Sequence, residues 1–110
     1  MKLCMAQINT LVGDIAGNTQ RVLEVSAAQK AAGAHTVVFP ELTLTGYPPE
    51  DLLLRGDLLD RSEAALARLC AELPPDLAVI VGYPRRQDGV LFNSAGVISA
   101  GKLLAQYDKQ

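Results

Sequence analysis

Two segments, residues 36–39 (TVVF) and 77–83 (LAVIVGY), lack the alternation of apolar and polar side chains that a half-exposed strand shows. Continuous runs of this kind are typical of parallel strands that are covered on both faces. Because parallel strands need a crossover connection, usually a helix, this feature constrains the chain to an α/β fold. The helix is indicated by side chains that recur between the two runs at spacings of three and four: Leu59, Ser62, Leu66, Leu69 and Leu73.

The remaining sequence extends this unit in both directions. Residues 3–8 predict a first strand, followed by a helix that Asn18 is predicted to N-cap and Gly33 to end. Residues 90–98 and 103–107 predict an antiparallel hairpin with a tight turn. The predicted order is β-α-β-α-β-β-β, with the helices on one face of the sheet. Only two good helices leave the other face uncovered, so we expect the first part of a larger domain, or a face that another subunit covers.

The composition is that of a globular domain with little net charge. Of 110 residues, 49% are hydrophobic, and 10 basic against 12 acidic side chains give a net charge of -2. No basic cluster is larger than the pair Arg85-Arg86, so we do not expect nucleic acid as a partner. No apolar run approaches the ~18 residues of a membrane span, and we expect a cytoplasmic protein.

Metal and thiol chemistry have few candidates. His35 is the single histidine, and Cys4 and Cys70 lie far apart without a CxxC pattern. We therefore expect no metal site and reduced thiols. Both cysteines fall within predicted strand or helix segments and are expected to be packed thiols rather than nucleophiles.

Glu41 comes directly after Pro40, at the end of the apolar run 36–39. The carboxyl ends of parallel strands are where open α/β sheets bind ligands, and Pro40, without an N–H, takes the chain out of the regular ladder. A carboxylate here either pairs with a cation or takes up a proton, because an unpaired charge is costly to bury. In both cases the surroundings tune the pKa of the carboxyl group, and its ionised form can act as a proton acceptor. The alternative from the residues alone is a solvent-exposed glutamate at a strand end.

Two further residues are candidates for the same edge of the sheet. Lys109 lies in the tail of the last predicted strand, so strand pairing could bring its ammonium group to Glu41, although a lysine near a chain end is more often solvated. Tyr47 follows Gly46 on the loop beside Glu41. It either lines a substrate channel or caps the core.

Three motifs together resemble the nitrilase superfamily: FPEL with TGY at residues 39–47, NSA at residues 93–95 and YDK at residues 107–109. The extension YPPEDLLLR at residues 47–55 narrows the resemblance to the glutaminase domains of bacterial glutamine-dependent NAD synthetases. The likeness covers the whole chain. It implies a partial nitrilase-type αββα sandwich, incomplete in this chain, with residues 1–110 as the N-terminal part of a carbon-nitrogen hydrolase domain.

The resemblance also implies roles for single residues. In the family a Glu-Lys-Cys triad hydrolyses the substrate: Glu41 matches the general base, and Lys109 matches the lysine that stabilises charge and the oxyanion. Tyr47 would lie near the glutamine pocket. The cysteine thiolate attacks the side-chain amide of glutamine and releases ammonia. A synthetase domain then uses the ammonia, with ATP and Mg²⁺, to convert nicotinic acid adenine dinucleotide to NAD.

The nucleophilic cysteine and the synthetase domain are absent from the 110 residues, since the family places that cysteine after the lysine motif. We therefore expect the chain alone to be inactive and to hold no cofactor, and relatives commonly assemble as homo-oligomers. One alternative is a stand-alone amidohydrolase of the same superfamily, acting on an amide or nitrile. The other is a non-catalytic α/β interaction module that binds a partner through its open sheet edge.

Overall fold

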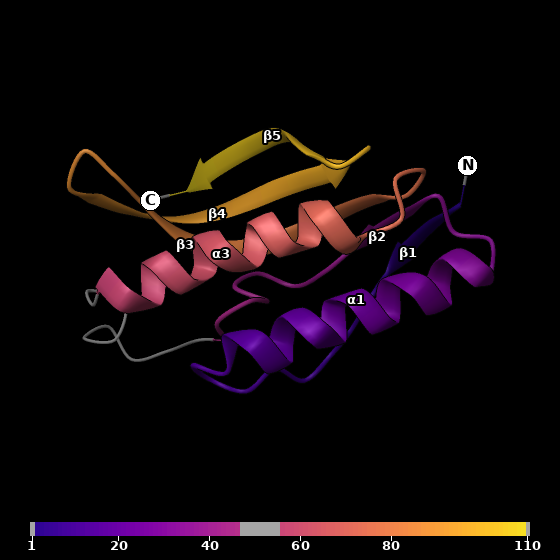
Figure 1. Ribbon diagram of the computed structural model, residues 1–110, viewed down its shortest axis with the longest axis horizontal. Helices are drawn as coiled ribbons and strands as arrows, with labels where there is room; N and C mark the ends of the chain where they lie inside the picture. Colours follow the sequence, from indigo (N-terminus) through magenta and orange to yellow (C-terminus); the bar gives the residue numbers. More distant parts are fainter. Residues whose placement is uncertain (1, 47–55, 110) are drawn as a thin grey trace.

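Five strands lie side by side in chain order, β1-β2-β3-β4-β5, in the computed structural model, which describes residues 2–46 and 56–109 (Figure 1). The elements of this part of the chain are β1 (Leu3–Met5), α1 (Ile15–Ala31), β2 (Thr36–Val38), α3 (Gly56–Glu72), β3 (Ala78–Gln87), β4 (Val90–Ser99) and β5 (Lys102–Lys109). Their order confirms the predicted α/β pattern.

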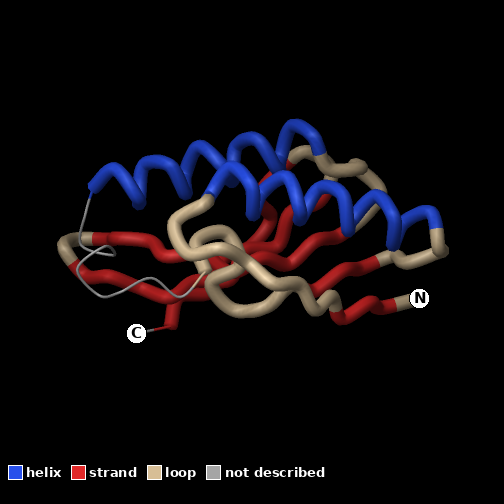
Figure 2. The backbone as a smooth tube through the Cα atoms, turned by 90° about the horizontal axis from the view of Figure 1, so that it is seen from below, coloured by secondary structure: helices blue, strands red, loops and turns tan. Residues whose placement is uncertain are grey.

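The sheet changes from parallel to antiparallel at β3. β1, β2 and β3 pair in parallel, whereas β3, β4 and β5 form an antiparallel meander. Both helices lie on one face, as the sequence predicts, because each connects two parallel strands (Figure 2). β3 and β4 have ten residues each, against three in β2, so they continue beyond the point where β2 ends.

The core fills the space between the helices and the sheet. Val22 of α1 and Leu69 of α3 are fully buried, together with Val37, Val79 and Val81 of the strands. Burial of such a side chain contributes about 1.5–3 kcal/mol, whereas intrinsic helix propensities differ by well under 1 kcal/mol per residue. Packing onto the sheet therefore holds the two helices in place.

The opposite face of the sheet carries no helix from the described residues (Figure 2). Leu3 and Met5 of β1 are 58% and 68% exposed, while Cys4 between them packs against the core. Tyr107 of β5 is 70% exposed. Within the described part of the chain, one face is thus open, as the predicted element order requires.

The start of α1 differs from the prediction. Asp14, not Asn18, is the N-cap, and its side chain accepts a hydrogen bond from the Gly17 N–H (3.1 Å). Asn18 is buried one turn further along, where its amide donates to the carbonyls of Leu11 and Leu44 and accepts from the Leu11 N–H. Asp and Asn are both favourable N-cap residues. Asp14 takes this position because the side chain of Asn18 is engaged with Leu11 and Leu44.

Two tight turns shape the meander. Ala100 (φ 54°) and Gly101 (φ 77°) join β4 to β5, which confirms the predicted hairpin. Asp88 (φ 51°) and Gly89 (φ 78°) join β3 to β4 in the same way. Paired positive φ values match the twist of an antiparallel hairpin. This second hairpin was not predicted, because β3 runs past the end of the apolar run 77–83.

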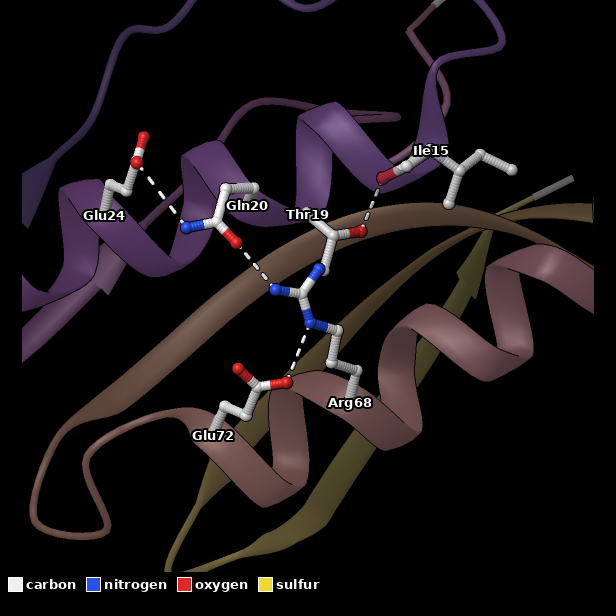
Figure 3. Close-up of polar contacts among 6 residues, drawn as sticks. All are labelled: Ile15, Thr19, Gln20, Glu24, Arg68 and Glu72. Carbon is white, nitrogen blue, oxygen red and sulfur yellow. Dashed lines mark hydrogen bonds and ion pairs between the residues drawn. The ribbon is translucent and has the colours of Figure 1, made fainter.

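A polar network joins the outer surfaces of α1 and α3 (Figure 3). Arg68 of α3 donates to the amide oxygen of Gln20 on α1 (2.6 Å) and to Glu72 on its own helix (2.8 Å). Gln20 in turn donates to Glu24 (3.5 Å). These groups are exposed, and an exposed ion pair contributes at most about 1 kcal/mol to stability. The network therefore orients these side chains between the two helices more than it stabilises the fold.

Candidate active site

Glu41 stands two residues past the last ladder bond of β2. The Phe39 N–H donates to the carbonyl of Ile80 on β3 (2.8 Å), and Pro40, which lacks an N–H, ends the pairing. The Glu41 side chain is 46% exposed. A half-exposed carboxylate at the carboxyl end of a parallel strand is accessible to a ligand, as the sequence predicts.

Glu41 opens a tight turn, residues 41–46, which we call the elbow. Its members from residue 42 on are buried. Leu42 adopts φ 52°, uncommon for a bulky residue, and its carbonyl accepts from the Gly46 N–H (2.8 Å). Asn18 of α1 donates to the Leu44 carbonyl (3.1 Å). Such a backbone conformation persists only where its surroundings enforce it, so the glutamate stands on a rigid support.

The elbow passes close over β3 at Gly82. A Cβ atom on Gly82 would lie 2.5 Å from the backbone nitrogen of Leu42 and 3.0 Å from the Cα of Glu41. No side chain fits in this space, so the glycine allows the elbow to approach β3 and reach towards β4. The sequence alone did not indicate this role, because Gly82 falls inside an apolar run.

β4 and β5 bring two polar side chains to Glu41. Asn93 and Lys109 are opposite each other in the β4–β5 ladder, so their side chains leave the same face of the sheet. The Asn93 amide donates to Oε1 of Glu41 (2.5 Å), and Nζ of Lys109 lies 3.8 Å from the same oxygen. The structure thus brings together Glu41 and Lys109, two of the three residues that the sequence predicts for this edge. Their chemical roles stay predictions.

These side chains border a cavity of about 260 Å³ on the helix-free face. Val38, Ile80 and Ala95 give it an apolar floor, and Tyr107 lines it beside Lys109. Pockets for drug-sized ligands measure about 300–1,000 Å³. The cavity therefore fits a small substrate with a polar group that faces the carboxylate.

A second polar cluster joins β3, β4 and β5 on the other side of the sheet; we call Arg85, Ser94 and Asp108 the clamp. Oδ1 of Asp108 accepts from the Ser94 hydroxyl (2.5 Å) and from Nε of Arg85 (3.1 Å), and Oδ2 accepts from the Arg85 guanidinium (2.8 Å). These hydrogen bonds, first of all those from Arg85, lower the pKa of Asp108 to about 2. Asp108 and Ser94 directly adjoin Lys109 and Asn93 in the chain.

A larger cavity, of about 520 Å³, is lined by α3, β3 and β5. Cys70 borders it, and burial raises the pKa of its thiol, which disfavours the thiolate form. Tyr83 lines it too; burial above all raises the pKa of Tyr83 to about 12, and its hydroxyl donates to Gln106. A thiol kept protonated agrees with the prediction that Cys70 is packed rather than nucleophilic. The smaller cavity beside Glu41 is therefore the better candidate site.

The remaining candidate residues have different outcomes. Tyr47 lies outside the described residues, so its predicted place near a substrate pocket stays a prediction. Asn93 belongs to one of the three motifs, but the sequence alone assigned it no role. The pairing register of the two motifs could have indicated its place in the site. When NSA at residues 93–95 pairs with YDK at residues 107–109, Asn93 lies opposite Lys109.

Residues 2–46 and 56–109 contain neither a metal-binding cluster nor a membrane-spanning helix. In these ranges no group of three or more His, Cys, Asp or Glu side chains is arranged to hold a metal ion. Neither helix of the described part is long and apolar enough to cross a membrane.

Comparisons with known proteins agree with this geometry. The family model described as carbon-nitrogen hydrolase matches residues 2–110. The chain is 42% identical over 111 residues to the glutamine-dependent NAD(+) synthetase of Xanthomonas campestris pv. campestris, covering 100% of this chain and 20% of that protein. The chain thus spans about a fifth of the length of such curated relatives.

Solved structures show the same fold. The glutamine-dependent NAD+ synthetase from Acinetobacter baumannii superimposes with a TM-score of 0.90 at 35% identity, covering 98% of this chain and 20% of that one. An amidase from Nesterenkonia sp. superimposes with a TM-score of 0.81 at 21% identity, covering 99% of this chain and 42% of that one. At this lower identity the likeness is one of fold alone.

Proposed function

Because this chain belongs to the carbon-nitrogen hydrolase family, we propose that it forms the first part of the glutaminase domain of a glutamine-dependent NAD synthetase. One observation carries the proposal: Asn93 and Lys109 meet Glu41 at a single carboxylate oxygen, beside a small cavity. The relatives named as such synthetases support it further.

In this proposal Glu41 is the general base. It takes the proton of a cysteine thiol supplied by a part of the protein outside these 110 residues. The thiolate attacks the side-chain amide carbon of glutamine, and the ammonium group of Lys109 stabilises the negative charge that develops on the oxygen. Return of the proton from Glu41 to the leaving nitrogen releases ammonia and leaves a γ-glutamyl thioester.

The second half of the cycle uses the same base. Glu41 takes a proton from water, which attacks the thioester, and glutamate leaves as the thiol recovers its proton. Throughout, Asn93 holds the carboxylate in position through its hydrogen bond to Oε1. The carbonyl carbon of glutamine must lie close to both the thiolate and Lys109, which a cavity of about 260 Å³ next to Glu41 permits.

The released ammonia would serve a ligase step. We assign ATP, Mg²⁺ and nicotinic acid adenine dinucleotide to the part of the protein outside this chain, where the dinucleotide would be converted to NAD. Tyr47 remains the proposed residue of the glutamine pocket. Cytoplasmic location and assembly as a homo-oligomer stay predictions.

The test is Glu41→Gln in the full-length protein. Glutamine-dependent NAD synthesis should be abolished, while synthesis from free ammonium should be largely retained, because only the first half-reaction needs the base. Both rates are measured with the same enzyme preparation, by following NAD formation with either nitrogen source.

Glu24→Gln on α1 is the matched control, since it removes a distant, exposed carboxylate and should leave both activities unchanged. Equal loss of both activities in Glu41→Gln would contradict the assignment and indicate damage to the fold. A wild-type protein that hydrolyses amides but forms no NAD from glutamine would favour the stand-alone amidohydrolase.

A further inference from the structure

β5 is an edge strand in the described part of the chain, and its side chains bury little surface. Every described residue of β5 is exposed except Asp108, which is half-buried. An exposed strand at the margin of a sheet has few packing contacts and opens at low cost in free energy. The position of the last residues of β5 therefore depends on a few specific anchors.

The clamp is the anchor nearest the site. The side chains of Arg85 and Asp108 are only 29% and 26% exposed and meet in a two-pronged guanidinium–carboxylate pair. Such pairs fix geometry as well as charge, because two parallel hydrogen bonds define the orientation of both groups. Ser94 adds a third hydrogen bond, so three neighbouring strands are tied together at one carboxylate.

The clamp and the candidate site occupy opposite sides of the same two strands. Successive side chains of a strand point to opposite faces. Asp108 is therefore directed to the helix side of the sheet while Lys109, the next residue, is directed to Glu41. Ser94 and Asn93 divide in the same way on β4, so a shift of the clamp moves the peptide that carries each site residue.

We propose that the clamp positions the Lys109 ammonium group beside Glu41 for the amide-hydrolysing reaction, with Arg85 and Asp108 as positioning residues. The inference rests on the proposed function. The Lys109 side chain is 68% exposed and its ammonium group lies 3.8 Å from the carboxylate, so burial of the side chain does little to fix that position. Misplacement by about 1 Å can cost a catalytic step about 100-fold, so loss of an anchor one residue away is sufficient to lower the rate.

The experiment uses the full-length protein with three variants: Asp108→Asn, Arg85→Gln and the double variant. The double variant is included because each single change leaves a polar or charged partner uncompensated. For each protein, kcat and KM are measured for ammonia release from glutamine, together with NAD synthesis from free ammonium. Crystal structures of the variants give the distance from Lys109 Nζ to Glu41 Oε1.

We expect kcat for glutamine to fall about 10- to 100-fold with KM changed less than about threefold, because the loss is of positioning rather than of substrate binding. The double variant should be no worse than the poorer single variant, since both changes break one unit. Synthesis from ammonium should persist, and the Nζ–Oε1 contact should be lost in the crystal structures. Glu72→Gln, which breaks an exposed arginine–carboxylate pair on α3, is the matched control and should behave as wild type.

Two results would overturn the proposal: a kcat within about twofold of wild type in all three variants, or a reduced kcat with the Nζ–Oε1 contact intact. Failure of the proposed function is a separate result. A wild-type protein that releases no ammonia from glutamine would refute that function, while the variant structures would still test whether the clamp positions Lys109.

Discussion

At Glu41 one oxygen atom receives two different interactions, and their magnitudes differ. Exposed ion pairs contribute about 0–1 kcal/mol, and the pair with Lys109 is exposed on both sides. The hydrogen bond from Asn93 is exposed as well, but it is directional and shorter, at 2.5 Å against 3.8 Å. Asn93 therefore fixes the carboxylate more strongly than Lys109 does. The ammonium group remains available for a charge that develops on a substrate.

Asn93→Ala should thus lower kcat for glutamine hydrolysis by about 10- to 100-fold, since each 1.36 kcal/mol of lost transition-state stabilisation is a factor of ten. The measurement is steady-state ammonia release by the full-length protein. Asn9→Ala, at an exposed loop residue, is the matched control. A kcat unchanged by Asn93→Ala would show that the elbow alone orients Glu41.

The sequence could predict two of these three site residues. Glu41 follows a buried strand and a proline, and Lys109 ends a strand, so both could be placed at the same edge of the sheet from local patterns. Asn93 could not be assigned a role, because its contact depends on the register between β4 and β5. Register is fixed by turn geometry and by the buried face, neither of which a single strand reveals.

At the scale of elements, the approach of the elbow to β3 decides where Glu41 points. Gly82→Ala would place a Cβ 2.5 Å from the Leu42 nitrogen, and backbone atoms cannot move away as a side-chain end can. We expect a loss of about 1–3 kcal/mol in stability, as for other overpacked sites, with a lower thermal midpoint. Glutamine-dependent synthesis should fall more than ammonium-dependent synthesis, because the displaced residue, Glu41, is the proposed base.

Gly96→Ala is the control for this change. Its new Cβ would meet side-chain atoms on the helix side of the sheet: the Tyr83 hydroxyl (2.7 Å), the end of the Leu103 side chain (2.8 Å) and Cε1 of the Tyr83 ring (3.0 Å). These atoms lie on the face of the sheet opposite Glu41, whereas Gly82 faces the backbone of the elbow, so this variant should keep the ratio of the two activities near that of wild type even if it lowers stability. Equal ratios in Gly82→Ala and Gly96→Ala would refute the role of Gly82 in placing Glu41.

Element existence was more predictable than element boundaries. Hydrophobic spacing predicted α3, and the continuous apolar runs predicted β2 and β3, because burial dominates those patterns. The β3–β4 hairpin was missed although Asp88-Gly89 is a strong turn signal, since polar residues at the end of β3 resemble a loop. Asn18 was misassigned because its partners, Leu11 and Leu44, lie in connecting segments 7 and 26 residues away in the sequence.

At the scale of the whole molecule, the two faces of the sheet differ in what they carry. One face is covered by helices and holds the core, and the other is open in the described part and carries the candidate site. The clamp links them, because it lies on the covered side and supports strands whose opposite side forms the site. Stability at the β4–β5 edge and the geometry of the site are therefore coupled through the sheet.

Acid should loosen this edge before the rest of the molecule. Arg85–Asp108 is less exposed than the pairs Lys30–Asp76, Arg68–Glu72 and Lys109–Glu41, and exposed pairs contribute little. The pKa of Asp108 is about 2 in the folded state, below its usual value of about 3.9 in an unfolded chain. Above pH ~4 the carboxylate is charged in both states, and the contribution of the clamp to stability is complete.

As the pH falls from about 4 towards 2, the opened state takes up its proton first, and the contribution of the clamp is lost. Hydrogen exchange of β5 amides, wild type against Asp108→Asn in the full-length protein, measures this directly. The wild type should protect β5 better at pH 5, and the two proteins should converge near pH 2, while the helices differ at neither pH. A protection ratio that stays constant from pH 5 to pH 2 would show that Asp108 does not hold the edge through its charge.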